Sequence, residues 1–257
     1  MSINLIGLQQ SFDGLASVQI TADYCRIDLH QPMTCFSNAP WRGGMQTGIQ
    51  GILNLKVAKD AKPDPLTGEH EPLEHTFPRV VQELTMTMNS VGMMTAASMK
   101  SFRFHFETIQ EYALLICVTS GLDNARRVGD PADDPGLHLT NTSGTPPLPA
   151  GTINMMMVTN APLSQAAAIE AIALLTEAKT AACYDLGVPS RKLPFPNTEH
   201  TAKLATGTGT DATLVAIPQE HEGSAILYCG KHTLLGEKIG AGSYRILTDT
   251  LQACLGS

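Results

Sequence analysis

The sequence is organised around Leu204-Ala-Thr-Gly-Thr-Gly-Thr-Asp-Ala-Thr-Leu-Val215, a loop of glycines and hydroxyls that leads into an apolar, β-branched run. Such a run is typical of a buried strand. The two glycines permit a positive φ and let a ligand approach the main chain, while Thr206, Thr208, Thr210 and Asp211 supply hydrogen-bonding groups and a candidate base. The ordinary alternative is a Gly-Thr turn capped by an aspartate, because Thr and Asp in turns often bond only their own backbone. Spacing alone favours that alternative.

Length and charge limit the classes of protein that the chain can belong to. Its 257 residues can bury one large core or two smaller ones without metals or disulfides. No linker interrupts the sequence, so we predict a single domain over residues 1–257. The net charge of -7 argues against a nucleic-acid partner, because phosphate contacts need clustered Lys and Arg.

The six cysteines and the absence of long apolar runs bear on metals, redox state and membranes. The cysteines stand at 25, 35, 117, 183, 229 and 254 without a C-x-x-C pair, so we expect buried, reduced thiols and no metal site. No leader segment is visible, and no apolar run approaches the roughly 20 residues of a membrane helix. We therefore expect a soluble, cytoplasmic protein with no membrane contact.

Hydrophobic periodicity predicts a mixed α/β domain in which helices cover sheets of mixed or antiparallel strands. Strands are predicted within residues 15–36 around a turn near Gln31-Pro32, at 101–108, 112–118 and 152–158, in the run that ends near Ile217-Pro218, and at 225–228. Helices are predicted at 78–88, from Pro162 and Ser164 to Tyr184, and from about Thr233 to the end of the chain. Residues 119–150 form a long connection, and loops of that length are usually functional.

Common catalytic motifs are missing from the sequence. There is no G-x-S-x-G elbow, P-loop, H-E-x-x-H pair or dinucleotide fingerprint. The Gly-Thr loop looks superficially like a phosphate loop, but a strand follows it and so no helix N-terminus would hold the phosphate. His200 and His232 each flank a conspicuous segment. Each is a candidate general acid or base, and the alternative is a helix cap or a surface histidine.

Seven segments in order resemble the adenosylcobinamide amidohydrolases of cobamide salvage. They are Val91-Gly-Met-Met-Thr-Ala-Ala97, Thr119-Ser-Gly-Leu-Asp-Asn-Ala-Arg-Arg-Val-Gly-Asp-Pro-Ala132, Gly151-Thr-Ile-Asn154, Ala161-Pro-Leu-Ser164, Ala178-Lys-Thr-Ala-Ala182, Ala205-Thr-Gly-Thr-Gly-Thr-Asp-Ala212 and Gly230-Lys-His-Thr-Leu-Leu-Gly-Glu237. The resemblance covers roughly residues 30–250. It implies hydrolysis of the amide that joins the aminopropanol arm to the corrin ring, giving adenosylcobyric acid. It implies no separate cofactor, because the corrinoid substrate carries its own cobalt.

Amide hydrolysis needs a nucleophile, a proton donor for the leaving amine and stabilisation of the oxyanion. Our hypothesis names Asp211 or His232 as the base and a water molecule or a hydroxyl as the attacking group. The hydroxyl candidates are Ser37, Thr95, Thr208 and Thr210. Backbone amides of Gly43 and Gly44 or of Gly207 and Gly209 are the candidate oxyanion donors, and Asn38, Asn124, Arg126, Asn154 and Lys231 are candidates for holding the substrate. Trp41, Met93 and Met94 could form an apolar platform for the corrin, and Lys179 has a surface role or a site role.

Two other functions remain open from the sequence. Residues 158–164 resemble a segment of self-processing aminopeptidases built as a four-layer αββα sandwich, which makes that architecture a reasonable expectation here. The other hypothesis is a corrinoid-binding protein without catalysis, although the D-x-H-x-x-G signature of histidine-ligated cobamide binders is absent. The sequence leaves the oligomeric state open, a homo-oligomer included.

Overall fold

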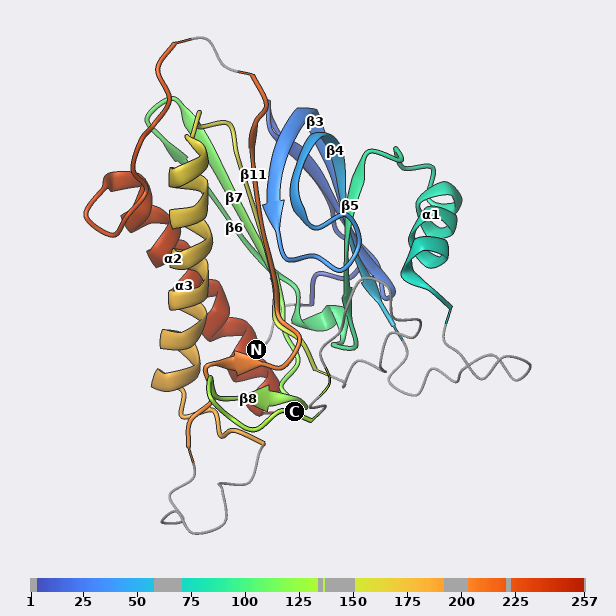
Figure 1. The fold of residues 1–257 in the computed structure, drawn as a ribbon, viewed down its shortest axis with the longest axis vertical. Coiled ribbons are helices and arrows are strands. Elements are labelled where there is room, and N and C mark those ends of the chain that lie inside the picture. Colours follow the sequence, from blue (N-terminus) through green and yellow to red (C-terminus); the bar gives the residue numbers. More distant parts are fainter. Residues whose placement is uncertain are drawn as a thin grey trace.

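The computed structural model describes residues 4–57, 71–133, 136, 151–191, 203–220 and 223–256 (Figure 1). The strands are β1 Gln9–Phe12, β2 Ala16–Ile20, β3 Tyr24–Ser37, β4 Gly44–Lys56, β5 Ser90–Thr95, β6 Arg103–Ile109, β7 Tyr112–Thr119, β8 Ala125–Arg126, β9 Asn154–Thr159, β10 Gly207–Thr208 and β11 Ala212–Pro218. The helices are α1 Leu73–Glu83, α2 Gln165–Asp185 and α3 Leu234–Leu255, with a short 3₁₀ turn at Met99–Ser101.

The long strand β3 joins two parts of a nine-stranded mixed sheet. One edge of β3 pairs with β4 along most of its length. Its other edge pairs first with β2, as in Val18 opposite Ile27, and then with β11, as in Val215 opposite Phe36. Beyond β11 the sheet continues through β9, β7 and β6, and β5 lies beyond β4. The sheet therefore branches at β3.

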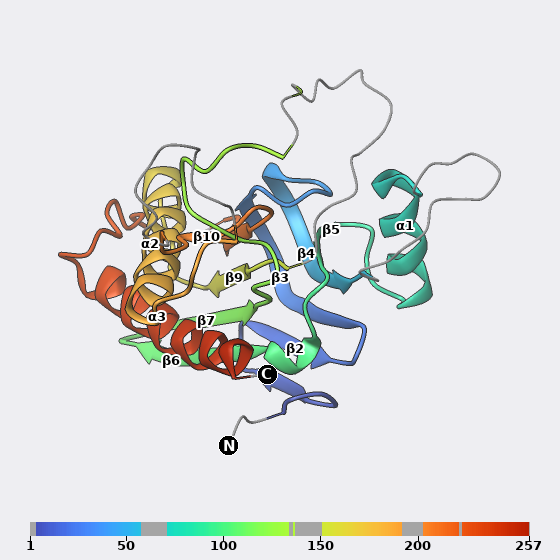
Figure 2. The same cartoon turned by 90° about the horizontal axis from the view of Figure 1, so that it is seen from below.

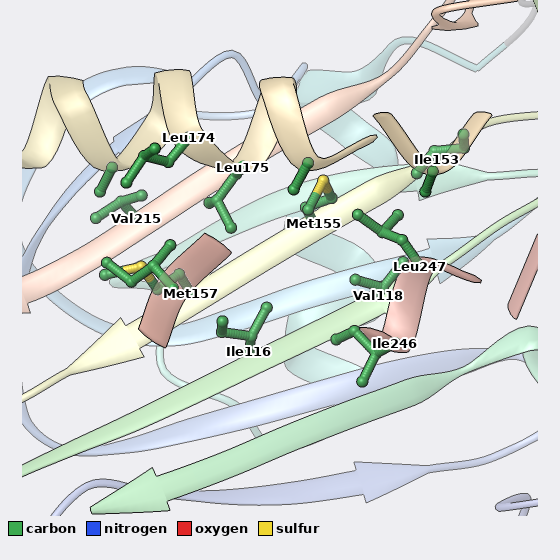
Figure 3. Packing of buried hydrophobic residues seen from close by; sticks show 14 of the residues in the cluster. Ile116, Val118, Ile153, Met155, Met157, Leu174, Leu175, Val215, Ile246 and Leu247 are labelled. Carbon is green, nitrogen blue, oxygen red and sulfur yellow. The ribbon is translucent and has the colours of Figure 1, made fainter. Parts of the chain in front are cut away.

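The sheet curls, and three apolar clusters separate its layers. One cluster, the concave core, fills the concave side of the sheet, between β2, β3, β4 and β5 and the inner faces of β7, β9 and β11. A second cluster, the helical core, lies between the outer faces of β7, β9 and β11 and the helices α2 and α3 (Figure 3). A third packs α1 against β4 and β5. Figures 1 and 2 show α2 and α3 on one side of the sheet and α1 on the other.

The mixed α+β class is confirmed, and the layers follow the order helix, sheet, sheet, helix of an αββα arrangement. The two sheet layers belong to one continuous, curled sheet. No helix in the described residues has the length and apolarity to cross a membrane.

Three local predictions differ from the structure. The turn expected near Gln31-Pro32 is an irregularity inside β3, where the register to β4 shifts between Asp28 and Met33, and a bulge tolerates the missing N–H of proline. The helix expected from Pro78 begins at Leu73 and holds Pro78 in its interior. The strand expected at 225–228 reduces to a single bridge between Leu163 and Ile226.

Candidate active site

The carboxylate of Asp211 holds the Gly-Thr loop together at the point where β11 begins. Its Oδ1 accepts hydrogen bonds from the Thr208 hydroxyl at 2.5 Å and the Ile153 amide at 2.9 Å. Its Oδ2 accepts from the Thr208 amide at 2.9 Å and from the Lys179 ammonium at 2.6 Å. Two bonds to each oxygen account for the four lone-pair sites of a carboxylate. Asp211 is therefore a fully occupied acceptor in this structure.

Lys179 reaches the loop from the middle of α2. The helix begins because the Ser164 hydroxyl accepts a hydrogen bond from the Ala167 amide, and its alanine-rich sequence favours helix and close packing on the sheet. The side chains of Lys179 and Asp211 are only 10% and 8% exposed. A buried ion pair of this kind gives little net stability compared with an apolar pair. Folding stability alone therefore gives no strong reason for a charged pair at this position.

Gly207 allows the loop to approach this ion pair closely. A Cβ atom at that position would overlap Asp211 Oδ2 and would come within 3.0 Å of the Lys179 ammonium nitrogen. Gly207 and Thr208 form β10, which pairs antiparallel with Arg126 and Ala125 of β8. The sequence after β7 thus fixes the backbone of the loop.

The Asn124 and Arg126 side chains contact the same loop beside Gly209. The Arg126 Nε donates to Asn124 Oδ1 at 3.0 Å, and the Arg126 guanidinium also pairs with Asp133. The Asn124 Nδ2 atom is buried without a hydrogen-bond partner in the described residues. Both side chains therefore pack against the loop at Gly209, and neither lines the cavity described next.

A cavity of about 480 Å³ opens beside the ion pair. It is lined by Phe36, Ser37, Asn38, Gly44, Ile169, Ile172, Thr176, Lys179, Asp211 and Thr213. Lys179 and Asp211 are the charged members of this set, and the isoleucines and Phe36 give it apolar walls. Pockets with mostly apolar walls and a few convergent polar groups are typical ligand sites.

The connection from β3 to β4 brings three predicted residues, Ser37, Asn38 and Gly44, to the cavity. The Asn38 side chain extends the pairing of β3 with the β11 segment through two hydrogen bonds to its backbone. Its Nδ2 donates to the Asp211 carbonyl at 2.9 Å, and its Oδ1 accepts from the Thr213 amide at 2.7 Å. Ser37 accepts a long hydrogen bond of 3.4 Å from the Ala39 amide. Gly44 has a φ of 82° where the chain turns into β4, and a Cβ at the neighbouring Gly43 would overlap the Ala39 carbonyl.

Asn154 lies deeper, at the start of β9. Its Nδ2 donates to Asn54 Oδ1 and to the Met94 carbonyl, both at 2.8 Å, and its Oδ1 accepts from the Ala212 amide at 3.2 Å. Asn54 in turn donates to the Thr119 hydroxyl at 2.8 Å. Asn154 is fully buried, and both of its donor hydrogens are used within the protein.

Two hydroxyl candidates are also used internally. Thr95 is buried and accepts a hydrogen bond from the Ala97 amide. Thr210 shares a hydrogen bond of 2.7 Å with the Thr152 hydroxyl. Of the four candidate hydroxyls, Ser37 is the one that lines the cavity. Thr208 is the one that contacts the candidate base Asp211.

Other predicted residues stand apart from the cluster. His232 is exposed in the turn before α3, and neither a hydrogen bond to Asp211 nor a place in the cavity lining joins it to the described site. Lys231 pairs with Glu177 on the surface, where the two side chains are 72% and 55% exposed. His200 lies outside the described residues. Trp41 is buried against Phe77, with ring centroids 5.2 Å apart, and Met93 is buried in the concave core.

Cys183 lies one helical turn after Lys179, and its surroundings make it unreactive. Burial, and to a smaller extent the charge of Asp211, raise the pKa of the thiol to about 11, while Lys179 lowers it. The nucleophilic form of cysteine is the thiolate. Cys183 is therefore a protonated core residue and no nucleophile near neutral pH. Among the described residues, no group of three or more His, Cys, Asp or Glu side chains is arranged to hold a metal ion.

One of three comparisons with known proteins, the match to a family model, agrees with the resemblance seen in the sequence. The family model described as adenosylcobinamide amidohydrolase matches residues 9–257. The uncharacterized protein MJ1613 of Methanocaldococcus jannaschii is 30% identical over 181 residues, which are 67% of each chain. The crystal structure of the PH0078 protein from Pyrococcus horikoshii OT3 aligns with 98% of this chain and 82% of its own, with 12% identity and a TM-score of 0.42.

Proposed function

The chain belongs to the adenosylcobinamide amidohydrolase family, and we propose that it hydrolyses the amide between the aminopropanol arm and the corrin ring of adenosylcobinamide. Water adds across the C–N bond, so that the carbonyl carbon gains a hydroxyl and the nitrogen gains a proton. The products are adenosylcobyric acid and aminopropanol. The reaction would serve cobamide salvage in the cytoplasm.

The observation that carries the proposal is the Lys179–Asp211 pair beside an apolar cavity. Acyl transfer from an amide passes through a tetrahedral intermediate with a negative oxygen, and fixed charges in a water-poor site stabilise that oxygen well. Such a site needs buried charge whose position is set before the substrate arrives. The four hydrogen bonds to Asp211 set the position of the pair here.

The size of the cavity indicates which part of the substrate enters it. Its volume of about 480 Å³ falls in the range that holds drug-sized ligands, roughly 300–1,000 Å³. A corrinoid is much larger, so one arm enters and the macrocycle stays at the mouth. Ile169, which lines the cavity, and Met45, which follows Gly44, are 60% and 53% exposed. These apolar side chains fit contact with the ring and take the place of the platform expected from Trp41.

Incubation of the purified chain with adenosylcobinamide tests the proposal directly. We expect release of aminopropanol and formation of adenosylcobyric acid, both measured by mass spectrometry. Asp211→Asn should lower turnover by up to about 10²–10³-fold, because it removes the charge that holds Lys179, whereas Asp249→Asn, at an exposed position of α3, should not change it.

Two outcomes would contradict the proposal in different ways. Stoichiometric binding of adenosylcobinamide without release of aminopropanol would make the chain a corrinoid carrier. A chain that splits into two fragments, instead of keeping its mass of 27.4 kDa, would favour the self-processing aminopeptidase. The Ser164 hydroxyl of that candidate segment caps α2 in the structure.

A further inference from the structure

We propose that Lys179 is a catalytic residue, whose ammonium donates a hydrogen bond to the oxygen of the scissile amide and stabilises the oxyanion, and that Asp211 is the residue that positions it. The assignment rests on the proposed function and deepens it. It also changes the role of Asp211, which the sequence suggested as a base.

The hydrogen-bonding capacity of the two partners separates their roles. All four acceptor sites of Asp211 are occupied, so the carboxylate has no free lone pair with which to take a proton from water. An ammonium has three donor hydrogens. Lys179 donates one of them to Asp211, and the part of the chain that the structure describes offers no partner for the other two. Lys179 lines the cavity, and its spare donors are available to a bound substrate.

The contact with Asp211 at 2.6 Å suits Lys179 as a donor and not as a base. An ammonium donates hydrogen bonds without accepting any. A positive donor is what a developing oxyanion needs, and charge-assisted hydrogen bonds are about twice as strong as neutral ones.

The other polar groups of the cavity are weaker candidates for this role. Both ends of the Asn38 amide are engaged with β11. The Thr176 hydroxyl donates to the Ile172 carbonyl within α2. Ser37 is uncharged. Lys179 is therefore the one charged donor that the described cavity presents to a carbonyl oxygen.

Helical spacing places Lys179 on the substrate side of α2. Ile169, Ile172, Thr176 and Lys179 recur at intervals of three and four residues and all line the cavity, as expected for one face of a helix. The neighbouring face, with Ala171, Leu175, Ala178 and Ala182, packs on the sheet. One helix thus supplies both the apolar wall and the charged donor.

Lys179→Ala, followed by rescue with a small amine, is the central test. Loss of one oxyanion donor typically lowers kcat by about 10²–10³-fold, and we expect a fall of this size with a much smaller change in KM. Ethylammonium is small enough to enter the space vacated by the side chain and returns a positive donor to it. Its chloride salt should therefore restore kcat by about tenfold or more, with a saturating dependence on its concentration. Sodium chloride at equal ionic strength should not.

Two further variants separate catalysis from folding. Lys179→Arg keeps the positive charge beside Asp211 and should remain folded, but the larger guanidinium misplaces the donor and kcat should fall about tenfold or more. Lys238→Met is the matched control, because Lys238 is also a helical lysine paired with a carboxylate, that of Glu107 on β6, and does not line the cavity. Its turnover should equal that of the wild type.

The assignment is overturned if folded Lys179→Ala or Lys179→Arg keeps wild-type kcat, or if ethylammonium raises the melting temperature of Lys179→Ala without raising kcat. The second result would show a purely structural lysine. If Lys179→Ala does not fold, the kcat of Lys179→Arg decides. If the wild-type chain releases no aminopropanol, the proposed function itself fails, and this role of Lys179 fails with it.

Discussion

Gly207 is the residue at which backbone and ion pair come closest. An added Cβ would overlap Asp211 Oδ2, so Gly207→Ala must displace the carboxylate that holds Lys179. We expect a loss of about 1–3 kcal/mol of stability, as is usual when a packed site is overfilled, together with a fall in kcat. Chemical denaturation and steady-state kinetics measure the two effects.

Gly240 provides the matched control for that substitution. It lies inside α3 with nothing within 4 Å of an added Cβ, so Gly240→Ala should stabilise the chain by about 0.5–1 kcal/mol and leave kcat unchanged. Equal behaviour of the two alanine variants would show that the close approach at Gly207 has no consequence.

Thr208 is a positioning residue in our account, and Thr208→Val tests this role. The change keeps the side-chain shape and the backbone hydrogen bond but removes the hydroxyl that donates to Asp211 Oδ1. A hydrogen bond to a charged group contributes about 1.5–3 kcal/mol, so we expect kcat to fall by about 10–100-fold. A loss approaching about 10⁶-fold, as when a nucleophile is removed, would instead make Thr208 the attacking group.

The sequence predicted Asp211, Thr208 and Gly207 as one site because they are neighbours in the chain. Ser37 and Gly44 could be suggested only through the family resemblance, because they lie far from the Gly-Thr loop in the sequence. Lys179 was left between a surface role and a site role, because an alanine-rich helix does not reveal which neighbour its one lysine meets. The signal that could have identified it is the lysine inside a stretch whose other positions suit burial.

Among the elements, the ends of β4, β5, β9 and β11 are joined by the amide of Asn154. Asn154→Ala would remove the hydrogen-bond partner of three groups: the side-chain Oδ1 of Asn54, the backbone carbonyl of Met94 and the backbone amide of Ala212. Each unsatisfied buried group costs about 1–3 kcal/mol, so we expect at least about 3 kcal/mol of destabilisation by the same principle. Urea unfolding measures it. Exposed Asn89→Ala should change stability by less than about 0.5 kcal/mol, and a similar result at Asn154 would contradict the bridging role.

Local pattern predicted the elements better than their partners. The alternation of Phe102, Phe104 and Phe106 predicted the strand β6, but the expected burial is wrong in part, because His105 is buried and Phe106 is 38% exposed. Ser164 and Thr233 marked the starts of α2 and α3. The branching at β3 left no such signal, because one edge of that strand meets β2 and β11 in turn. Pairings of this kind depend on contacts distant in sequence, which a periodicity does not encode.

At the scale of the whole molecule, the curled sheet connects the site to both major cores. The strand β11 faces the concave core with Ala212, Leu214 and Ala216 and the helical core with Val215 and Ile217. Asp211 begins this strand, so the position of the ion pair depends on both sides of the sheet. A single folding unit over the whole chain, as the sequence predicts, would keep the site in place until the protein unfolds completely.

The buried cysteines provide a test of that single unit. Cys25, Cys35 and Cys117 lie in the concave core, and Cys183 and Cys229 lie in the helical core. Burial raises the pKa of all five thiols, to about 12 for Cys35 and Cys229 and about 11 for Cys183. Thiolates are the reactive form, so at pH 8 an alkylating reagent should label these residues only after unfolding. Pulsed alkylation in urea, read by mass spectrometry, should therefore give one common rate for the five, because cooperative unfolding exposes both cores together. Two rates, divided between the two sets, would show instead that the helical layer opens separately from the curled sheet.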